Sequence, residues 1–265
     1  MTRVSVIVPA WGETPLLERA CASVCAQTYP DVELVVAAPP ADGSQTLPAA
    51  RFAGLAKATG DWIAFCDADD WMEPNAIEEM LKAVERESAD CACCGMMRDG
   101  ADGKSVLCPF DRKGPSDTYN ALVNKLFRRE LLEGLSADFS ISLGEDLMVT
   151  AQALRKARKI AVMDAAFYHY CENSVSITHC QDGQKRVEDL ARVGELLREV
   201  LPEAEYADFH DRVARDALLL WIRHRVFDRT LWRELRSRMS GGLLDDPRHG
   251  VLKKGALACA ACLFD

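Results

Sequence analysis

The chain has 265 residues, a formal net charge of −9 at pH 7 and a hydrophobic content of 49%. This length suffices for one large α/β domain, or for a domain with an appendage, and for a core that needs no disulfides. The acidic balance excludes a general nucleic-acid-binding surface and favours small molecules or proteins as partners. No apolar run reaches the roughly 18 residues that span a bilayer.

The eleven cysteines raise the question of a disulfide framework or a metal site. Met1 leads within a few residues into a strand-like run, so we expect no signal peptide and a cytoplasmic protein with reduced thiols. Cys91, Cys93 and Cys94 are closely spaced, but not in the pattern of paired zinc ligands. We expect them to be buried thiols of a strand.

The first part of the chain alternates between strand and helix patterns. Continuous apolar, β-branched runs predict buried strands over residues 4–8, 32–36 and 62–66. A helix is expected after Thr14, which would cap it, and another over residues 48–59. This order predicts a right-handed, doubly wound parallel sheet whose ligands bind beyond the carboxyl ends of the strands.

The middle of the chain is less regular and its end is helical. In chain order, the pattern predicts a helix over residues 73–87, a strand over 91–97, a polar excursion over 98–116, helical character over 119–132, a helix over 144–154 and a short strand over 160–163. From residue 184 the composition changes to Arg, Glu and Leu at helical spacing. We therefore predict one domain over residues 1–178 and a helical C-terminal region over residues 179–265.

An acidic stretch follows the third predicted strand. Side chains alternate along an extended segment, so Asp67 and Asp69 are expected to point the same way and to converge on one hard cation. The alternative is a solvated acidic turn. In that alternative, Asp70 would cap a helix that begins near Glu73 and Pro74. With a metal site at Asp67 and Asp69, we expect Asp70 and Trp71 to be the start of the following helix.

Several motifs, in this order, resemble the family 2 glycosyltransferases of the GT-A fold. They are Val6-Ile7-Val8-Pro9, Ser23 with Gln27-Thr28-Tyr29-Pro30, Ala50-Arg51 with Gly54-Leu55-Ala56, Gly60-Asp61-Trp62-Ile63-Ala64-Phe65, Asp67-Ala68-Asp69-Asp70-Trp71, Asn124-Lys125-Leu126-Phe127 and Glu145-Asp146. The resemblance covers roughly residues 4–178. It implies an α/β, GT-A type fold with a doubly wound, mostly parallel sheet flanked by helices. It also implies transfer of a sugar, with inversion, from a nucleotide-diphosphate donor to an acceptor hydroxyl.

The resemblance implies a divalent metal, Mn²⁺ or Mg²⁺, on the donor diphosphate. Asp69 would be its ligand, and Asp67 would contact the metal or the donor ribose. The chemistry agrees, because a cation held by one or two carboxylates offsets the charge that develops on a diphosphate leaving group. His169 is a weaker candidate for the metal shell, and an ordinary packed histidine is the favoured alternative.

Inversion needs a general base on the acceptor side of the sugar. The resemblance assigns Asp146 to this role, with Glu145 binding the acceptor or orienting the base. The alternative is that both acids only complement a helix N-terminus.

We expect the donor contacts to lie in the matching motifs and beside them. They are Pro9, Ala10, Trp11, Asp42, Arg51, Asp67, Ala68 and Lys125. The alternative for Arg51 and Lys125 is that both are solvated cations with no role in binding. We expect a UDP-sugar as donor, a saccharide or lipid-linked acceptor, and a role in the synthesis of cell-surface polysaccharide or glycoconjugate.

The sequence departs from the family pattern where a nucleobase would bind. The second predicted strand ends in Ala37 and Ala38, where the family usually has an acid pair, and Cys171 stands where an Arg is expected. A non-catalytic binding or assembly module is therefore the alternative to an enzyme, although the retained acids favour activity. Nucleotidyl transfer would require a Gly-rich basic loop after the first strand, and Trp11-Gly12-Glu13 does not supply one.

The C-terminal region mixes basic and aromatic residues. Arg223 and Arg225 lie near Trp221, Phe227 and Trp232. One hypothesis is a peripheral contact with the inner face of the plasma membrane. The alternative is a set of packed helices with a basic rim.

Overall fold

The computed structural model describes residues 2–41, 43–108, 121–172, 183–226, 228–237, 239 and 251–264. The chain divides into two compact units. The first comprises Met1–Ser140 and Val149–Ser176, and the second comprises Ile141–Met148 and Ile177–Asp265. The second unit thus includes a short segment that the sequence assigns to the first domain.

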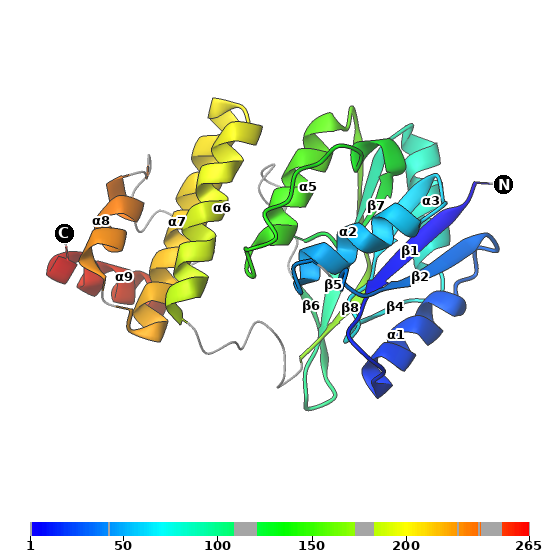
Figure 1. The fold of residues 1–265 in the computed structure, drawn as a ribbon, viewed down its shortest axis with the longest axis horizontal. Helices are drawn as coiled ribbons and strands as arrows, with labels where there is room; N and C mark the ends of the chain where they lie inside the picture. The colour runs from blue at the N-terminus through cyan, green and yellow to red at the C-terminus, as the bar shows by residue number, and fades with distance from the viewer. Residues whose placement is uncertain are drawn as a thin grey trace. The chain divides into compact units, whose positions relative to one another are not determined.

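The first unit is built on a mixed sheet, shown in Figure 1. Its described strands are β1 (Val4–Pro9), β2 (Val32–Ala37), β3 (Trp62–Phe65), β4 (Trp71–Met72), β5 (Cys91–Asp99), β6 (Ser105–Cys108), β7 (Lys125–Arg128) and β8 (Ile160–Cys171). They follow the order β2-β1-β3-β7-β5-β8-β4, with β6 paired to β5. The helices that begin in this unit are α1 (Pro15–Cys25), α2 (Leu47–Lys57) and α3 (Ala76–Glu87).

The N-terminal part confirms the predicted parallel core. Strand β1 pairs in parallel with both β2 and β3. Thr14 caps α1, because its Oγ1 accepts a hydrogen bond from Leu17 N at 3.1 Å. Gly60 allows the chain to approach β1 closely, since a Cβ there would lie 2.6 Å from Ser5 N. The carboxyl ends of β1, β2 and β3 therefore meet at one edge of the sheet.

Two predictions for the middle of the chain are wrong in detail. The segment predicted to be helical over residues 119–132 contains β7, which pairs antiparallel with β3 and β5 and is followed by a 3₁₀ turn at Arg129–Leu131. Leu126 and Phe127 are completely buried, and packing between two strands outweighs their helical propensity. Strand β8 is also much longer than the predicted residues 160–163. Residues 98–116 contain the strand β6, but residues 109–116 lie outside the described residues.

The second unit is helical, as predicted for the C-terminal region. Its helices are α6 (Gly183–Val200), α7 (Glu203–His224), α8 (Arg229–Ser237) and α9 (Val251–Phe264), and α5 (Glu145–Lys156) begins in this unit. Figure 1 shows α6 and α7 side by side.

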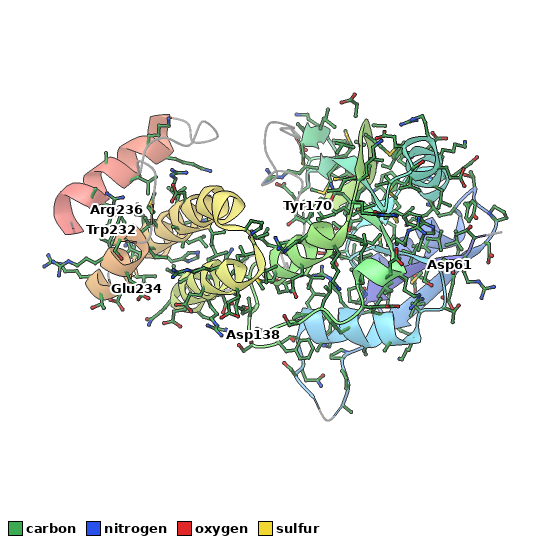
Figure 2. The ribbon with its side chains drawn as sticks, turned by 90° about the horizontal axis from the view of Figure 1, so that it is seen from above. Asp61, Asp138, Tyr170, Trp232, Glu234 and Arg236 are labelled. Atoms are coloured by element: carbon green, nitrogen blue, oxygen red, sulfur yellow. The ribbon has the colours of Figure 1, made fainter. Side chains whose placement is uncertain are left out.

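Two tryptophans lie in the core of the helical unit. The rings of Trp221 and Trp232 are 5.0 Å apart between centroids, and both side chains are buried. Figure 2 shows Trp232 on α8 together with Glu234 and Arg236. Burial of both rings favours packed helices over the membrane hypothesis, while Phe227 lies outside the described residues. Within the described part of the chain, no helix combines the length and the apolar character needed to cross a bilayer.

The three closely spaced cysteines are buried in β5. Burial raises the pKa of Cys91 and Cys93, and raises that of Cys94 to about 12. These side chains are therefore neutral thiols that contribute to the core, as the sequence predicts.

Asp90 joins the start of β5 to the loop before β8. Its buried carboxylate accepts hydrogen bonds from Arg158 N at 2.9 Å and from the Arg158 guanidinium at 2.9 and 3.1 Å, and Arg128 lies 3.6 Å away. The hydrogen bonds from Arg158 lower the pKa of Asp90 against the opposing effect of burial.

We predict that Asp90→Asn lowers the free energy of unfolding by about 1–3 kcal/mol at pH 7. Because the folded-state pKa of Asp90 is lowered, its contribution is present above the unfolded pKa near 3.9 and is lost as the pH falls through the folded value. Urea unfolding between pH 7 and pH 3.5 should show the difference shrinking below about pH 4. Glu130→Gln, at an exposed acid beside Arg128, is the control. A difference that stays constant with pH would contradict the assignment.

Candidate active site

The acidic stretch forms a turn at the carboxyl edge of the sheet. Strand β3 ends at Phe65, and Asp70 N then donates a hydrogen bond to Asp67 O at 3.0 Å. The prediction that alternation along a strand orients Asp67 and Asp69 is therefore wrong, because the backbone is not extended here. The directions of these side chains are set by the turn instead.

Arg51 of α2 and Asp67 form a partly buried ion pair. The Arg51 Nη2 atom lies 2.7 and 3.0 Å from the two Asp67 carboxylate oxygens, and only 6% of the Arg51 side chain is exposed. A solvated Arg51 is thus excluded. The structure brings together two of the predicted site residues, and Arg51 would act on a donor through Asp67 or beside it.

Arg19 of α1 also binds the turn, although sequence reasoning missed it. Its Nη2 donates a hydrogen bond to the Asp69 carbonyl oxygen at 2.5 Å. Arg19 lies on an otherwise ordinary amphipathic helix, and the sequence carries no signal that separates it from a solvated cation. Two arginines from different helices therefore support the acidic turn.

Asp70 does not begin a helix, contrary to the prediction. Trp71 and Met72 form β4, and α3 begins only at Ala76. Asp70 is instead 1% exposed, and its carboxyl group accepts hydrogen bonds from Tyr168 OH at 2.6 Å and from Cys171 N at 2.9 Å. Burial, together with the charge of the nearby Asp67, raises the pKa of Asp70 to about 8.

Tyr168 connects Asp70 to the acidic turn. Its hydroxyl donates to Asp70 and accepts from Asp67 N at 3.1 Å. Burial raises its pKa well above the ordinary value, so the hydroxyl keeps its proton. The turn is thus attached to β8, a contact that the sequence did not indicate.

His169 is a packed histidine in this structure. Its Nδ1 lies 3.1 Å from both Asp99 carboxylate oxygens, and its Nε2 lies 3.1 Å from Glu73 Oε1. The Trp71 ring stacks on it with centroids 3.6 Å apart. Both ring nitrogens have protein partners, which favours the alternative over a metal ligand.

The predicted donor contacts after β1 lie beside the altered end of β2. Ala10 N donates to Ala37 O at 3.0 Å, while Pro9 is buried and the Trp11 side chain is exposed. Asp42, another of the predicted donor contacts, lies outside the described residues.

The Lys125 side chain is not available to contact a nucleotide-sugar donor in this structure. It is 1% exposed, and its ammonium group donates to Ala121 O and to Asn124 Oδ1. Both partners lie in the segment just before β7. We therefore leave Lys125 out of the proposed donor site.

Glu145 and Asp146 begin α5 and belong to the second unit. Asp146 Oδ1 accepts a hydrogen bond from Leu147 N at 2.8 Å. The helix N-terminus complements both charges, so the structure agrees with a helix-start role as well as with catalysis. Gly144 has a φ of +87°, which allows the chain to turn into the helix.

The residues present fit a metal held mainly by substrate oxygens. Among the described residues, no group of three or more His, Cys, Asp or Glu side chains is arranged to hold a metal ion. Mg²⁺ and Mn²⁺ are commonly bound by one or two carboxylates together with phosphate oxygens and water. Asp67 is paired with Arg51, and Asp69 remains the ligand that the sequence predicts.

The mixed sheet with an acidic turn at the end of β3 defines a GT-A-like α/β fold, and comparisons with known proteins agree. A model of the family described as "Glycosyl transferase family 2" matches residues 41–107. The chain is 25% identical over 215 residues to the uncharacterized glycosyltransferase EpsJ of Bacillus subtilis (strain 168), covering 66% of this chain and 62% of EpsJ. The chain is thus similar to family 2 glycosyltransferases over part of its length, and it has a GT-A-like fold.

Solved structures show the same fold at low identity. The crystal structure of Staphylococcus aureus TarS in complex with UDP-GlcNAc superposes with a TM-score of 0.63 at 16% identity, covering 89% of this chain and 88% of that one. The mannosyltransferase PcManGT from Pyrobaculum calidifontis, in complex with GDP-Man and Mn²⁺, gives a TM-score of 0.53 at 17% identity, with 99% and 80% coverage. The chain spans less than two thirds of the length of the first curated relatives it matches.

Proposed function

We propose that this chain transfers a sugar, with inversion, from a UDP-sugar to an acceptor hydroxyl with the aid of a divalent metal. The observation that carries the proposal is the acidic turn of Asp67 and Asp69, supported by Arg51 and Arg19 at the carboxyl edge of the parallel strands. The turn lies inside the segment that matches the family. The TarS complex with UDP-GlcNAc supports the donor class, and the PcManGT complex supports Mn²⁺.

In the proposed mechanism, Asp69 would hold the metal and Asp67 would lie at the donor. When bound, Mn²⁺ or Mg²⁺ would offset the charge on the diphosphate leaving group. Arg51 keeps Asp67 in place, and Arg19 fixes the carbonyl of Asp69, so the turn is organised before the donor binds. A preorganised turn reduces the free energy needed to position the diphosphate.

Asp146 would act as the general base. It accepts the proton of the acceptor hydroxyl as that oxygen attacks the anomeric carbon from the face opposite the diphosphate. The bond from the anomeric carbon to the diphosphate breaks, and its electron pair leaves with the diphosphate. Glu145 would bind or orient the acceptor.

The acceptor class is proposed from a relative. TarS, which is 23% identical over 266 residues, is described as a poly(ribitol-phosphate) beta-N-acetylglucosaminyltransferase. We propose a saccharide or lipid-linked acceptor and a role in cell-surface polysaccharide or glycoconjugate synthesis. The non-catalytic alternative rests on the end of β2, where Ala37 and Ala38 replace the acid pair.

A panel of nucleotide sugars tests the proposal. We expect a UDP-sugar to stabilise the protein by about 2–3 kcal/mol at 100 times its Kd, with Mn²⁺ present, and to release UDP when acceptor is added. Asp69→Asn should abolish the metal-dependent part of this stabilisation. Asp61→Asn, at the exposed acid labelled in Figure 2, is the matched control and should behave as the wild type. If no nucleotide sugar stabilises the wild type with metal present, the non-catalytic alternative is correct.

A further inference from the structure

The segment Ile141–Met148 is attached to the helical unit by one carboxylate. Asp189 of α6 accepts hydrogen bonds at its Oδ2 from Ser142 N at 2.8 Å and from Ser142 Oγ at 2.6 Å. Its Oδ1 accepts from Lys185 Nζ at 2.9 Å. The Asp189 side chain is only 7% exposed, so these bonds are largely shielded from water. A buried carboxylate with such donors holds the Ser142 backbone firmly.

A second contact fixes the same segment two residues later. A Cβ added at Gly144 would lie 3.2 Å from Leu190 Cδ2 and 3.2 Å from Val193 Cγ2, so the backbone passes directly over α6. Gly144 also has a left-handed φ of +87°, which a side chain would disfavour. Ile141 and Met148 at the two ends of the segment are buried. The segment therefore has a defined path along α6.

This path ends at the proposed catalytic acids. Asp146 lies four residues after Ser142 and two after Gly144. Its carboxylate is held locally by Leu147 N, but the position of the whole first turn of α5 depends on the segment before it. A general base must lie within hydrogen-bonding distance of the proton it removes, so a small shift of that turn is costly.

We propose that Asp189 is a positioning residue for Asp146, and that α6 therefore contributes to catalysis by fixing the start of α5. This inference rests on the proposed function, in which Asp146 is the general base. Asp189 itself touches no reacting atom. It fixes Ser142, and through the segment that follows it fixes the start of α5.

Steady-state kinetics distinguish positioning from simple stabilisation. Asp189→Ala is expected to lower kcat by about 10- to 100-fold, while the KM for the UDP-sugar stays within about twofold. Asp189→Asn should restore part of kcat, because its amide oxygen still accepts from Ser142 N. Glu188→Gln, at the exposed neighbouring acid, and Lys185→Met, which leaves both Ser142 bonds intact, are controls expected to retain kcat.

Hydrogen exchange gives a readout that does not depend on activity. In Asp189→Ala, amides of residues 142–148 should exchange at least about 10-fold faster than in the wild type, with the core of α6 and α7 unchanged. If Asp189→Ala does not fold, Ser142→Ala is the milder variant, and we expect a smaller change in the same direction. Unchanged exchange in this segment, or an unchanged kcat in a folded variant, would overturn the inference.

Failure of the proposed function has a different signature. A wild type that releases no nucleotide from any donor, or an Asp146→Asn variant that keeps full turnover, contradicts the assignment of the base and with it the catalytic part of this inference. A wild type that turns over normally beside an unaffected Asp189→Ala contradicts the inference alone.

Discussion

Asp146→Asn is expected to lower kcat by about 10²- to 10⁴-fold, which is the usual contribution of a general base. The amide cannot accept the proton of the acceptor hydroxyl, so attack on the anomeric carbon loses its base. The variant should still fold, because the Asn side-chain oxygen can accept the hydrogen bond from Leu147 N that Asp146 accepts at 2.8 Å. UDP release at saturating donor and acceptor measures the loss.

The donor-binding step provides the control for this prediction. Stabilisation by the UDP-sugar with Mn²⁺ should equal that of the wild type, since Asp146 does not bind the donor in the proposed mechanism. Glu145→Gln, at the adjacent acid, should mainly raise the KM for the acceptor. Turnover in Asp146→Asn within threefold of the wild type would exclude Asp146 as the base and leave only its helix-start role.

Asp70→Ala is expected to lower the free energy of unfolding by about 2–3 kcal/mol at pH 5, because two buried donors lose their acceptor. These donors are the hydroxyl of Tyr168, which is completely buried, and the backbone N–H of Cys171. Loss of the hydrogen bond between Asp70 and Tyr168 should also loosen the acidic turn, since Tyr168 OH accepts a hydrogen bond from Asp67 N as well.

The destabilisation caused by Asp70→Ala should become smaller as the pH rises. The folded-state pKa of Asp70 is raised to about 8, so the folded protein keeps a proton that the unfolded chain releases near its ordinary pKa of about 3.9. The contribution of Asp70 to stability is therefore fully present below about pH 4 and is lost as the pH rises toward 8. Asp70→Ala has no titrating side chain at this position, so its stability does not fall with pH for this reason. The difference in stability between the wild type and the variant therefore shrinks.

Urea unfolding in EDTA at several pH values between 5 and 8 checks this prediction. Asp102→Ala, at an exposed acid of the hairpin between β5 and β6, is the control and should change stability by less than about 0.5 kcal/mol. A difference between wild type and Asp70→Ala that grows with pH would contradict the assignment of a buried, protonated Asp70.

The sequence alone determined the parallel core and the location of the acidic turn. Continuous apolar runs and a capping threonine are local signals, because each acts within a few residues along the chain. They place Asp67 and Asp69 at the end of β3, and the ordered motifs carry the resemblance to family 2 glycosyltransferases. The start of α5 at Glu145 is likewise visible from its acids and the preceding glycine.

The tertiary structure alone decided what surrounds these residues. Asp70 binds Tyr168, and Arg51 binds Asp67, through contacts between residues far apart in the sequence that no periodic pattern records. The conversion of the predicted helix around Leu126 into β7 depends on the two strands that flank it. The attachment of Ser142 to Asp189 likewise required α6 to be in place, because a hydrogen bond between distant residues depends on distance in space and leaves no trace in local spacing.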